Sequence, residues 1–333
     1  MSEETSGETL VRRACLARPV LCLVLCLLLA TGTPARALDL LRVGNDAPSS
    51  IPNCALDIGI ARGIFARHGL EIAPSIFFGS AKGQPALISG AVDVLVGAGS
   101  EMVFIARGAP ERAVAVVSGQ PADMALVATD PAAIAGPAWL KGRRLGISNP
   151  GGLTDWLAHL LLRRAGLAAG DVTLISAGNS ATEAAMLRTG GLDAAVMDSL
   201  TADTLQARGG GHVVQSFGAS VPDFAQGVIY ARTDLIAQRP EVLRALLAGW
   251  FEALGLMLSE PPAAIGCIVA RMGADPAAGA RVFALMRDEI SPDGRFRPAA
   301  MAVLAHSFVE MGTLPEPPDM AALYTEAFLP PSR

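Results

Sequence analysis

The sequence predicts an α/β protein of two similar lobes, each a mostly parallel sheet flanked by helices, with two crossover strands joining them. Three observations indicate this class. Short apolar strands alternate with helical patterns from Leu40 to Ser199. The same order of elements occurs twice in that region. The length of 333 residues also exceeds the roughly 100–200 residues of one typical domain.

The composition is that of a folded protein with a large core. Hydrophobic residues make up 51% of the chain and charged residues 17%, which excludes an intrinsically disordered protein. The formal net charge is −5, so the sequence argues against a nucleic-acid-binding protein, which needs a basic face.

The N-terminal segment has the pattern of an export signal. Val20–Ala30 is an apolar run behind Arg12, Arg13 and Arg18, and it is shorter than the about 20 residues that span a bilayer. Ala35-Arg36-Ala37 then matches a signal-peptidase site. We expect residues 1–37 to be a signal peptide cleaved after Ala37. An uncleaved anchor is the alternative, and the choice between general and twin-arginine export stays open.

Cys54 and Cys267 are the cysteines that follow this segment. Export would place them in an oxidising compartment, where they could pair. Because both lie in apolar helical patterns, the sequence favours two separate buried thiols over a disulfide.

The first repeat begins with the expected strand Leu40–Gly44, which leads into a polar loop. A helix with apolar residues at Leu56, Ile60 and Ile64 follows, at the i, i+4, i+8 spacing of one helix face. The pattern then predicts a strand at Ile72–Phe78, a helix starting near Gly79-Ser80 and a strand at Val92–Val96.

The second repeat has expected strands at Arg144–Ile147, Val172–Ser176 and Ala194–Met197. Four residue types recur one hundred positions apart: Ser80 and Ser180, Leu87 and Leu187, Gly90 and Gly190, Asp93 and Asp193. Several matches in register, beside the same order of elements, indicate two lobes of one design.

Two further strand-like stretches, Met124–Thr129 and Gly227–Arg232, flank the second repeat and are the expected crossovers. We therefore predict that residues 38–128 and 226–333 form lobe 1 and residues 129–225 form lobe 2. The stretch 240–328 is expected to be helical, with prolines at helix starts, and to close over lobe 1.

Six segments of the chain match one protein family in their order and spacing: Ala61–Phe65, His68–Glu71, Ala86–Asp93, Leu140–Gly146, Asn149–Gly152 and Asp193–Asp198. In these segments the chain resembles the periplasmic substrate-binding proteins of the nitrate/sulfonate/taurine and thiamine-precursor transport group. The resemblance implies a type II periplasmic binding protein fold, an importer of the ABC class as partner, and a small ligand bound between the lobes.

Polar and glycine-rich loops follow four expected strands, and ligands of such sheets sit beyond the carboxyl ends of the strands. Helix N-termini there offer unpaired N–H groups, although ordinary helix caps use the same residue types. Two acids, Glu101 and Asp198, fall at corresponding strand ends. The expected ligand-binding residues are Asn45, Asp46, Ser49, Ser80, Ala81, Ser100, Glu101, Gln120, Ser148, Asn149, Gly151, Gly152, Thr154, Asn179, Ser180 and Asp198.

These residues favour a ligand with a donor end and an acceptor end. Acids would face the donor end, and helix N-termini the acceptor end, which fits an aminosulfonate or an aminopyrimidine better than nitrate or sulfate. The aromatic residue nearest the glycine loop, Trp156, is expected to be core rather than a ligand contact.

The sequence offers no pattern typical of catalysis. Its four histidines lack metal-ligand spacing, and it contains no H-E-x-x-H, G-x-S-x-G or Walker motif. We predict a periplasmic, monomeric solute-binding protein without metal, cofactor or catalytic residue, which meets the membrane through its permease and does not bind nucleic acid. The alternative is a sensory or enzyme-associated module on the same fold, such as one related to thiamine-pyrimidine biosynthesis.

Overall fold

The computed structural model describes residues 37–46, 51–221, 223–273 and 275–331. The predicted signal peptide, apart from Ala37, and the predicted site residue Ser49 lie outside these residues. Residues 39–333 form one compact unit, within which all elements below are found.

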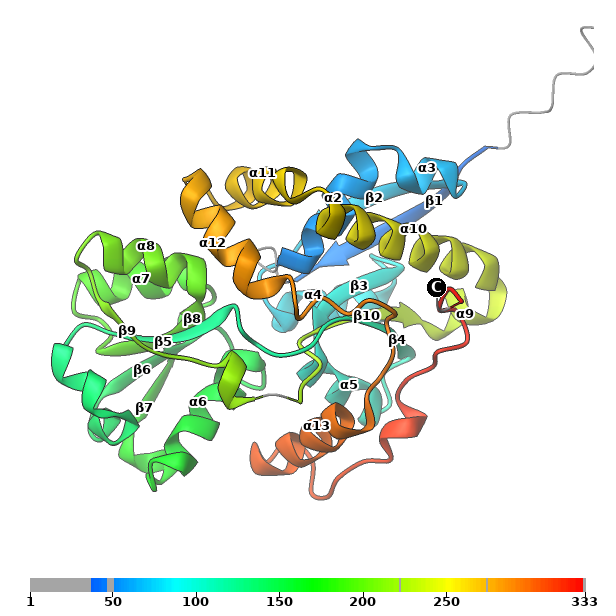
Figure 1. Cartoon of the computed structure of the whole chain (residues 1–333). Coiled ribbons are helices and arrows are strands. Elements are labelled where there is room, and N and C mark those ends of the chain that lie inside the picture. Colours follow the sequence, from blue (N-terminus) through cyan, green and yellow to red (C-terminus); the bar gives the residue numbers. More distant parts are fainter. Residues whose placement is uncertain (1–36, 47–50, 222, 274, 332–333) are drawn as a thin grey trace, which may run out of the picture. The chain divides into compact units, whose positions relative to one another are not determined.

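Ten strands form two five-stranded sheets (Figure 1). The first has the order β2-β1-β3-β10-β4 and the second the order β7-β6-β8-β5-β9. The strands are β1 (Asp39–Asn45), β2 (Leu70–Ile76), β3 (Val94–Ala98), β4 (Glu111–Ser118), β5 (Met124–Ala128), β6 (Arg144–Ile147), β7 (Thr173–Ser176), β8 (Ala194–Asp198), β9 (His212–Ser216) and β10 (Gly227–Arg232).

The two sheets have the same pairing pattern. In the first, β1 pairs in parallel with β2 and β3, and β10 runs antiparallel between β3 and β4. In the second, β6 pairs in parallel with β7 and β8, and β5 runs antiparallel between β8 and β9. The expected α/β class with two mostly parallel sheets is confirmed.

Helices flank both sheets, and in Figure 1 α6, α7 and α8 surround the second one. The α-helices are α2 (Cys54–Ala61), α3 (Ile64–Arg67), α4 (Ser80–Ser89), α5 (Met102–Ala106), α6 (Leu153–Arg164), α7 (Ser180–Arg188), α8 (Ser199–Ala207), α9 (Thr233–Gln238), α10 (Pro240–Ser259), α11 (Pro261–Met272), α12 (Pro276–Met286) and α13 (Pro298–Glu310). Short 3-10 turns are η1 (Ile51–Asn53), η2 (Gly99–Glu101), η3 (Pro131–Ala135), η4 (Pro137–Leu140), η5 (Ala169–Asp171), η6 (Gly218–Ser220) and η7 (Met320–Ala322).

The long helix α10 is a core element of the first half. Among the described residues it is the one helix long and apolar enough to cross a membrane. Half of its apolar stretch is buried, and Trp250 within it is fully buried in a hydrophobic core that also contains residues of α2. Burial against other elements of the protein accounts for its apolar composition.

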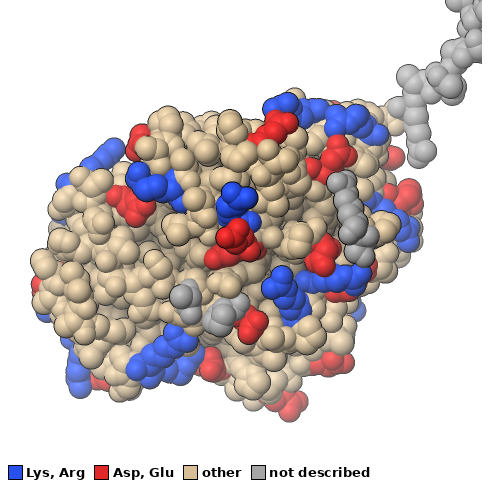
Figure 2. All heavy atoms as spheres, in the orientation of Figure 1, with Lys and Arg blue, Asp and Glu red and all other residues tan. Residues whose placement is uncertain are grey.

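On the face of the molecule in Figure 2, acidic and basic side chains are interspersed.

The two strands expected to cross between the lobes each follow a connection between the sheets directly and pair as inner strands of a sheet. Met124–Ala128 is β5, paired on both sides by β8 and β9, and lies in the second sheet rather than the first. Gly227–Arg232 is β10, paired by β3 and β4. The chain passes between the sheets through residues 119–123 and 217–226. Strands β4 and β9 were not expected from the sequence.

The expectation of two separate thiols is wrong. Cys54 and Cys267 form a disulfide, with their Cα atoms 6.0 Å apart. The two residues are 213 positions apart, and packing of α11 against α2 brings them together.

Candidate functional site

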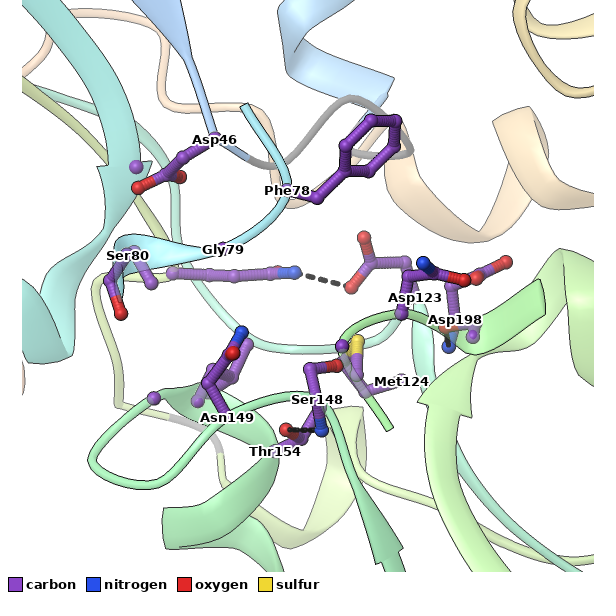
Figure 3. Close-up of a pocket in the computed structure, with 18 of the residues that line it drawn as sticks. Asp46, Phe78, Gly79, Ser80, Asp123, Met124, Ser148, Asn149, Thr154 and Asp198 are labelled. Atoms are coloured by element: carbon purple, nitrogen blue, oxygen red, sulfur yellow. Dashed lines mark hydrogen bonds between the residues drawn. The ribbon is translucent and has the colours of Figure 1, made fainter. Parts of the chain in front are cut away.

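The two sheets contribute their loop ends to a cavity of about 490 Å³. Figure 3 shows Asp46 and Phe78 on one side of it, with Ser148 and Asn149 opposite. The sequence-predicted residues that line this cavity are Asp46, Ser80, Glu101, Ser148, Asn149, Gly152, Thr154, Asn179, Ser180 and Asp198.

Five predicted residues do not line the cavity: Asn45, Ala81, Ser100, Gln120 and Gly151. Asn45 is buried and accepts a hydrogen bond from Asn53 Nδ2 at 2.8 Å. The side chain of Ser100 is buried, and the backbone N–H of Gly151 donates to Asp155 Oδ2 at 2.8 Å. Asn45 and Gly151 thus make hydrogen bonds within their own segments of the chain rather than line the cavity.

A buried acid pair forms the first-sheet side of the cavity. Asp46 follows β1, and Glu101 ends the short turn η2 after β3. A Cβ atom on Gly97 would come within 2.9 Å of Asp46 Oδ2 and 2.6 Å of Glu101 Oε2, so the bare glycine leaves room for both carboxyl groups. Glu101 accepts hydrogen bonds from Gln84 Nε2 at 2.7 Å and from the Ala98 N–H at 3.0 Å.

The two members of this acid pair both have raised pKa values. Burial raises the pKa of Asp46 well above its usual value, and the neighbouring Glu101 carboxylate raises it further. Burial also raises the pKa of Glu101, while hydrogen bonds from Asp46, Gln84 and the Ala98 N–H lower it in part. Because each carboxyl group changes the pKa of the other, the two titrate together.

Hydroxyl groups, amides and helix N-termini form the opposite side of the cavity. Thr154 Oγ1 accepts a hydrogen bond from the Ser148 N–H at 2.8 Å (Figure 3). Gly152 precedes α6 without a side-chain cap. Asn179 caps α7 by accepting from the Thr182 N–H at 2.9 Å, which is the ordinary capping role that the sequence left open. This side therefore offers N–H groups and a positive helix end to an acceptor.

Asp198 both lines the cavity and caps a helix. It lines the cavity, and it caps α8 by accepting from the Thr201 N–H at 2.8 Å and from Thr201 Oγ1 at 2.9 Å. Its own N–H donates to Ser180 Oγ at 3.1 Å.

The segments that connect the sheets add residues that sequence reasoning missed. Asp123 and Gln226 line the cavity, as does Met124 at the start of β5, and Gln226 Nε2 donates a hydrogen bond to Asp123 Oδ1 (Figure 3). Burial raises the pKa of Asp123 to about 6; the bond from Gln226 opposes the shift and the charge of Asp198 adds to it. An acid directly before an expected strand was the available signal.

Phe78 is the aromatic residue that lines the cavity, and its side chain is 51% exposed. Trp156 is buried, as expected, and stacks on Phe224 with ring centroids 4.6 Å apart. An aromatic lip at Phe78 offers a face for a planar or apolar part of a ligand.

Arg271, near the end of α11, also lines the cavity. Its Nε donates to Asp57 Oδ2 on α2, and its side chain is 15% exposed. Sequence reasoning missed it because the four loops contain no arginine and α11 lies far along the chain. Among the described residues, no group of three or more His, Cys, Asp or Glu side chains is arranged to hold a metal ion.

The family model for NMT1/THI5-like proteins matches residues 55–264. The chain belongs to the NMT1/THI5-like family. A sequence comparison with curated proteins gives no significant match.

Solved structures share the fold across most of the chain. The alkanesulfonate-binding protein SsuA from Xanthomonas axonopodis pv. citri, bound to MOPS, is 18% identical with a TM-score of 0.74, covering 87% of this chain and 99% of that one. The periplasmic aliphatic sulphonate binding protein SsuA from Escherichia coli is 20% identical with a TM-score of 0.71, covering 86% and 92%. The periplasmic nitrate-binding protein NrtA from Synechocystis PCC 6803 is 14% identical with a TM-score of 0.61, covering 72% and 69%.

Proposed function

We propose that this protein is an extracytoplasmic solute-binding protein of an ABC importer. It binds one small organic solute in the cavity between the sheets and presents it to a permease, with no covalent step. Export through the signal-like residues 1–37, with cleavage after Ala37, places the mature monomer in the periplasm. The family membership and the similar sulfonate- and nitrate-binding proteins support this role.

The class of solute follows from the different polar groups on the two sides of the cavity. Asp46 and Glu101 accept donors on one side, while α6 and α7 begin on the other with N–H groups and hydroxyls. A simple inorganic anion would meet buried carboxyl groups at an electrostatic cost. A solute with an amine or amidine donor at one end and a sulfonate or ring-nitrogen acceptor at the other satisfies both sides.

A calorimetric panel on the purified mature protein tests this proposal. Taurine, an aminosulfonate, and 4-aminopyrimidine represent the expected solutes, and nitrate and sulfate represent inorganic anions. We expect binding of at least one organic probe and none of either inorganic anion. Tight nitrate or sulfate binding that Glu101→Gln leaves undiminished would contradict the proposed solute.

Gly152→Leu tests whether the cavity is the binding site. Gly152 lines the cavity with an extended backbone, so leucine fills the cavity without a forbidden φ angle. Gly170→Leu is the matched control, because Gly170 lies in an exposed turn of the same half with open space around it. We expect Gly152→Leu alone to weaken binding more than tenfold, about 1.4 kcal/mol. A change below about threefold, 0.7 kcal/mol, would exclude the cavity.

A further inference from the structure

Two crosslinks one helical turn apart join α2 to α11. The Cys54–Cys267 disulfide is the first, and the ion pair between Asp57 and Arg271 is the second. Asp57 lies three residues after Cys54, and Arg271 four residues after Cys267, so both crosslinks use the same faces of the two helices. Cys267 Sγ is 3.7 Å from Asp57 Oδ2, which makes the two crosslinks one continuous contact.

This contact lies beside the cavity. Asn53, the residue before Cys54, lines the cavity, and so does Arg271. The disulfide therefore joins the first residue of α2, next to Asn53, to the turn of α11 that precedes Arg271.

Arg271 brings a positive charge to a cavity lining that is otherwise rich in acids. The described lining residues include four acids, Asp46, Glu101, Asp123 and Asp198, and Arg271 is the one lysine or arginine among them. The acidic group of a solute would therefore bind most favourably next to the Arg271 guanidinium rather than next to the four acids. Arginine suits such a group because its guanidinium offers a planar fork of N–H donors to carboxylate-like oxygens.

We propose that Arg271 is a specificity-determining residue that binds the acidic group of the solute. Asp57 and the Cys54–Cys267 disulfide are positioning elements, because the bond from Arg271 Nε to Asp57 fixes the guanidinium plane and the disulfide fixes α11 against α2. The inference rests on the proposed solute-binding function and refines it: the acidic group of the solute binds Arg271 in addition to the N–H groups where α6 and α7 begin.

Matched probes separate charge recognition from general damage. Taurine carries a sulfonate, and taurinamide replaces it with a neutral sulfonamide of nearly the same size. We expect Arg271→Gln to weaken taurine binding at least tenfold, to change taurinamide binding less than twofold, and so to abolish the preference for the acid. Arg271→Lys, which keeps the charge, should recover part of that preference.

Arg62→Gln is the control. Arg62 pairs with Glu260 at 3.1 Å, so the variant also removes an ion pair between the α2 and α11 ends, but Arg62 lies outside the cavity lining. It should leave the affinities for both probes unchanged.

Positioning is tested by Asp57→Asn and by the double variant Cys54→Ala with Cys267→Ala. Each should reduce the ratio of taurine to taurinamide affinity, whereas a merely structural role would lower the melting temperature and leave that ratio unchanged. If the double cysteine variant does not fold, Asp57→Asn decides this part.

Taurine binding that Arg271→Gln does not alter would overturn this inference while leaving the proposed function intact. Wild-type protein that prefers taurinamide to taurine would overturn it as well. Wild-type protein that binds neither probe nor 4-aminopyrimidine would contradict the proposed solute class, and this inference with it.

Discussion

The two halves of the molecule share a scaffold and differ in the chemistry that each presents to the cavity. Arg42 pairs with Asp93 in the first half, and Arg144 pairs with Asp193 in the second, through the same set of backbone and side-chain bonds. These two ion pairs place Asp46 and Ser148 at equivalent positions after β1 and β6. The ion pairs are the same in both halves, whereas the cavity residue that follows the strand differs: it is Asp46 in the first half and Ser148 in the second.

The helices that follow show how the divergence is accommodated. In the first half a Cβ on Gly83 would come within 2.8 Å of the Asp46 Cβ, so the glycine makes room for an acid at the cavity. The second half has Glu183 on α7 instead, fully buried behind Gly146. Across these equivalent positions the first half thus has an acid, Asp46, that lines the cavity, whereas the acid of the second half, Glu183, does not line it.

The largest expected change in the free energy of unfolding comes from replacing one fully buried acid in each half, Glu111 or Glu183. Burial raises the pKa of Glu111 to about 8, with a smaller contribution from the charge of Glu101. Burial likewise raises the pKa of Glu183 to about 8, with a contribution from Asp198. The unfolded chain ionises these groups near pH 4.5, so their contribution to the free energy of unfolding falls as the pH rises from about 4.5 to about 8.

We therefore expect Glu111→Gln and Glu183→Gln each to stabilise the protein at pH 8 and to have little effect at pH 4. At 1.36 kcal/mol per pKa unit, the gain at pH 8 reaches up to about 4 kcal/mol for each variant. Chemical denaturation across this pH range measures it, and the double variant should show nearly additive gains. Equal effects at pH 4 and pH 8 would exclude the buried charge as the cause.

The next largest change in the free energy of unfolding is expected from substitutions at a pair of equivalent glycines. Gly79 and Gly178 follow β2 and β7, share a φ of +84°, and donate to the carbonyls of Asp46 and Ser148 at 2.9 Å. A Cβ on Gly79 would lie 2.0 Å from Asn149 Nδ2 across the cavity, while one on Gly178 would meet nothing within 4 Å.

Alanine at either position should cost about 1–2 kcal/mol of unfolding free energy from the positive φ. Gly79→Ala should cost more than Gly178→Ala, and Asn149→Ala should remove the excess in a double-mutant cycle. Urea denaturation of the single and double variants measures the coupling. Identical losses at the two glycines, with no coupling to Asn149, would show that the halves do not touch there in solution.

The smallest effect is expected at the repeated ion pairs. Arg42 and Arg144 are both substantially exposed, so removing their charge should have little effect. Arg42→Gln and Arg144→Gln should lower the melting temperature slightly and equally. Asp93→Ala and Asp193→Ala should lower it more, because each aspartate also accepts the N–H of its partner arginine at 3.0 and 2.8 Å. Unequal drops for the two arginines would break the equivalence of the halves.

The repeat was predictable because its signals are local. The match of Asp93 with Asp193 in the sequence corresponds to two real ion pairs, and the glycine and serine loops after the strands do reach the cavity. The order of strands and helices follows from short-range periodicity, which each half repeats.

The rest depends on contacts between distant segments. The flanks of the second repeat gave no indication that β5 lies between β8 and β9, because antiparallel pairing partners are not encoded in the strand itself. The Cys54–Cys267 disulfide joins residues 213 positions apart, and Arg271 reaches the cavity through the packing of α11 on α2. Spacing along the chain contains no trace of either arrangement.

Gln226 links the two segments that connect the sheets. Its N–H donates to the carbonyls of Ser118 and Gly119, its own carbonyl accepts from the Gly99 N–H, and its side chain holds Asp123. These bonds tie the outgoing and the returning segment together at one residue. Gln226 also lines the cavity, so a solute bound there would contact the residue that links both connections between the sheets.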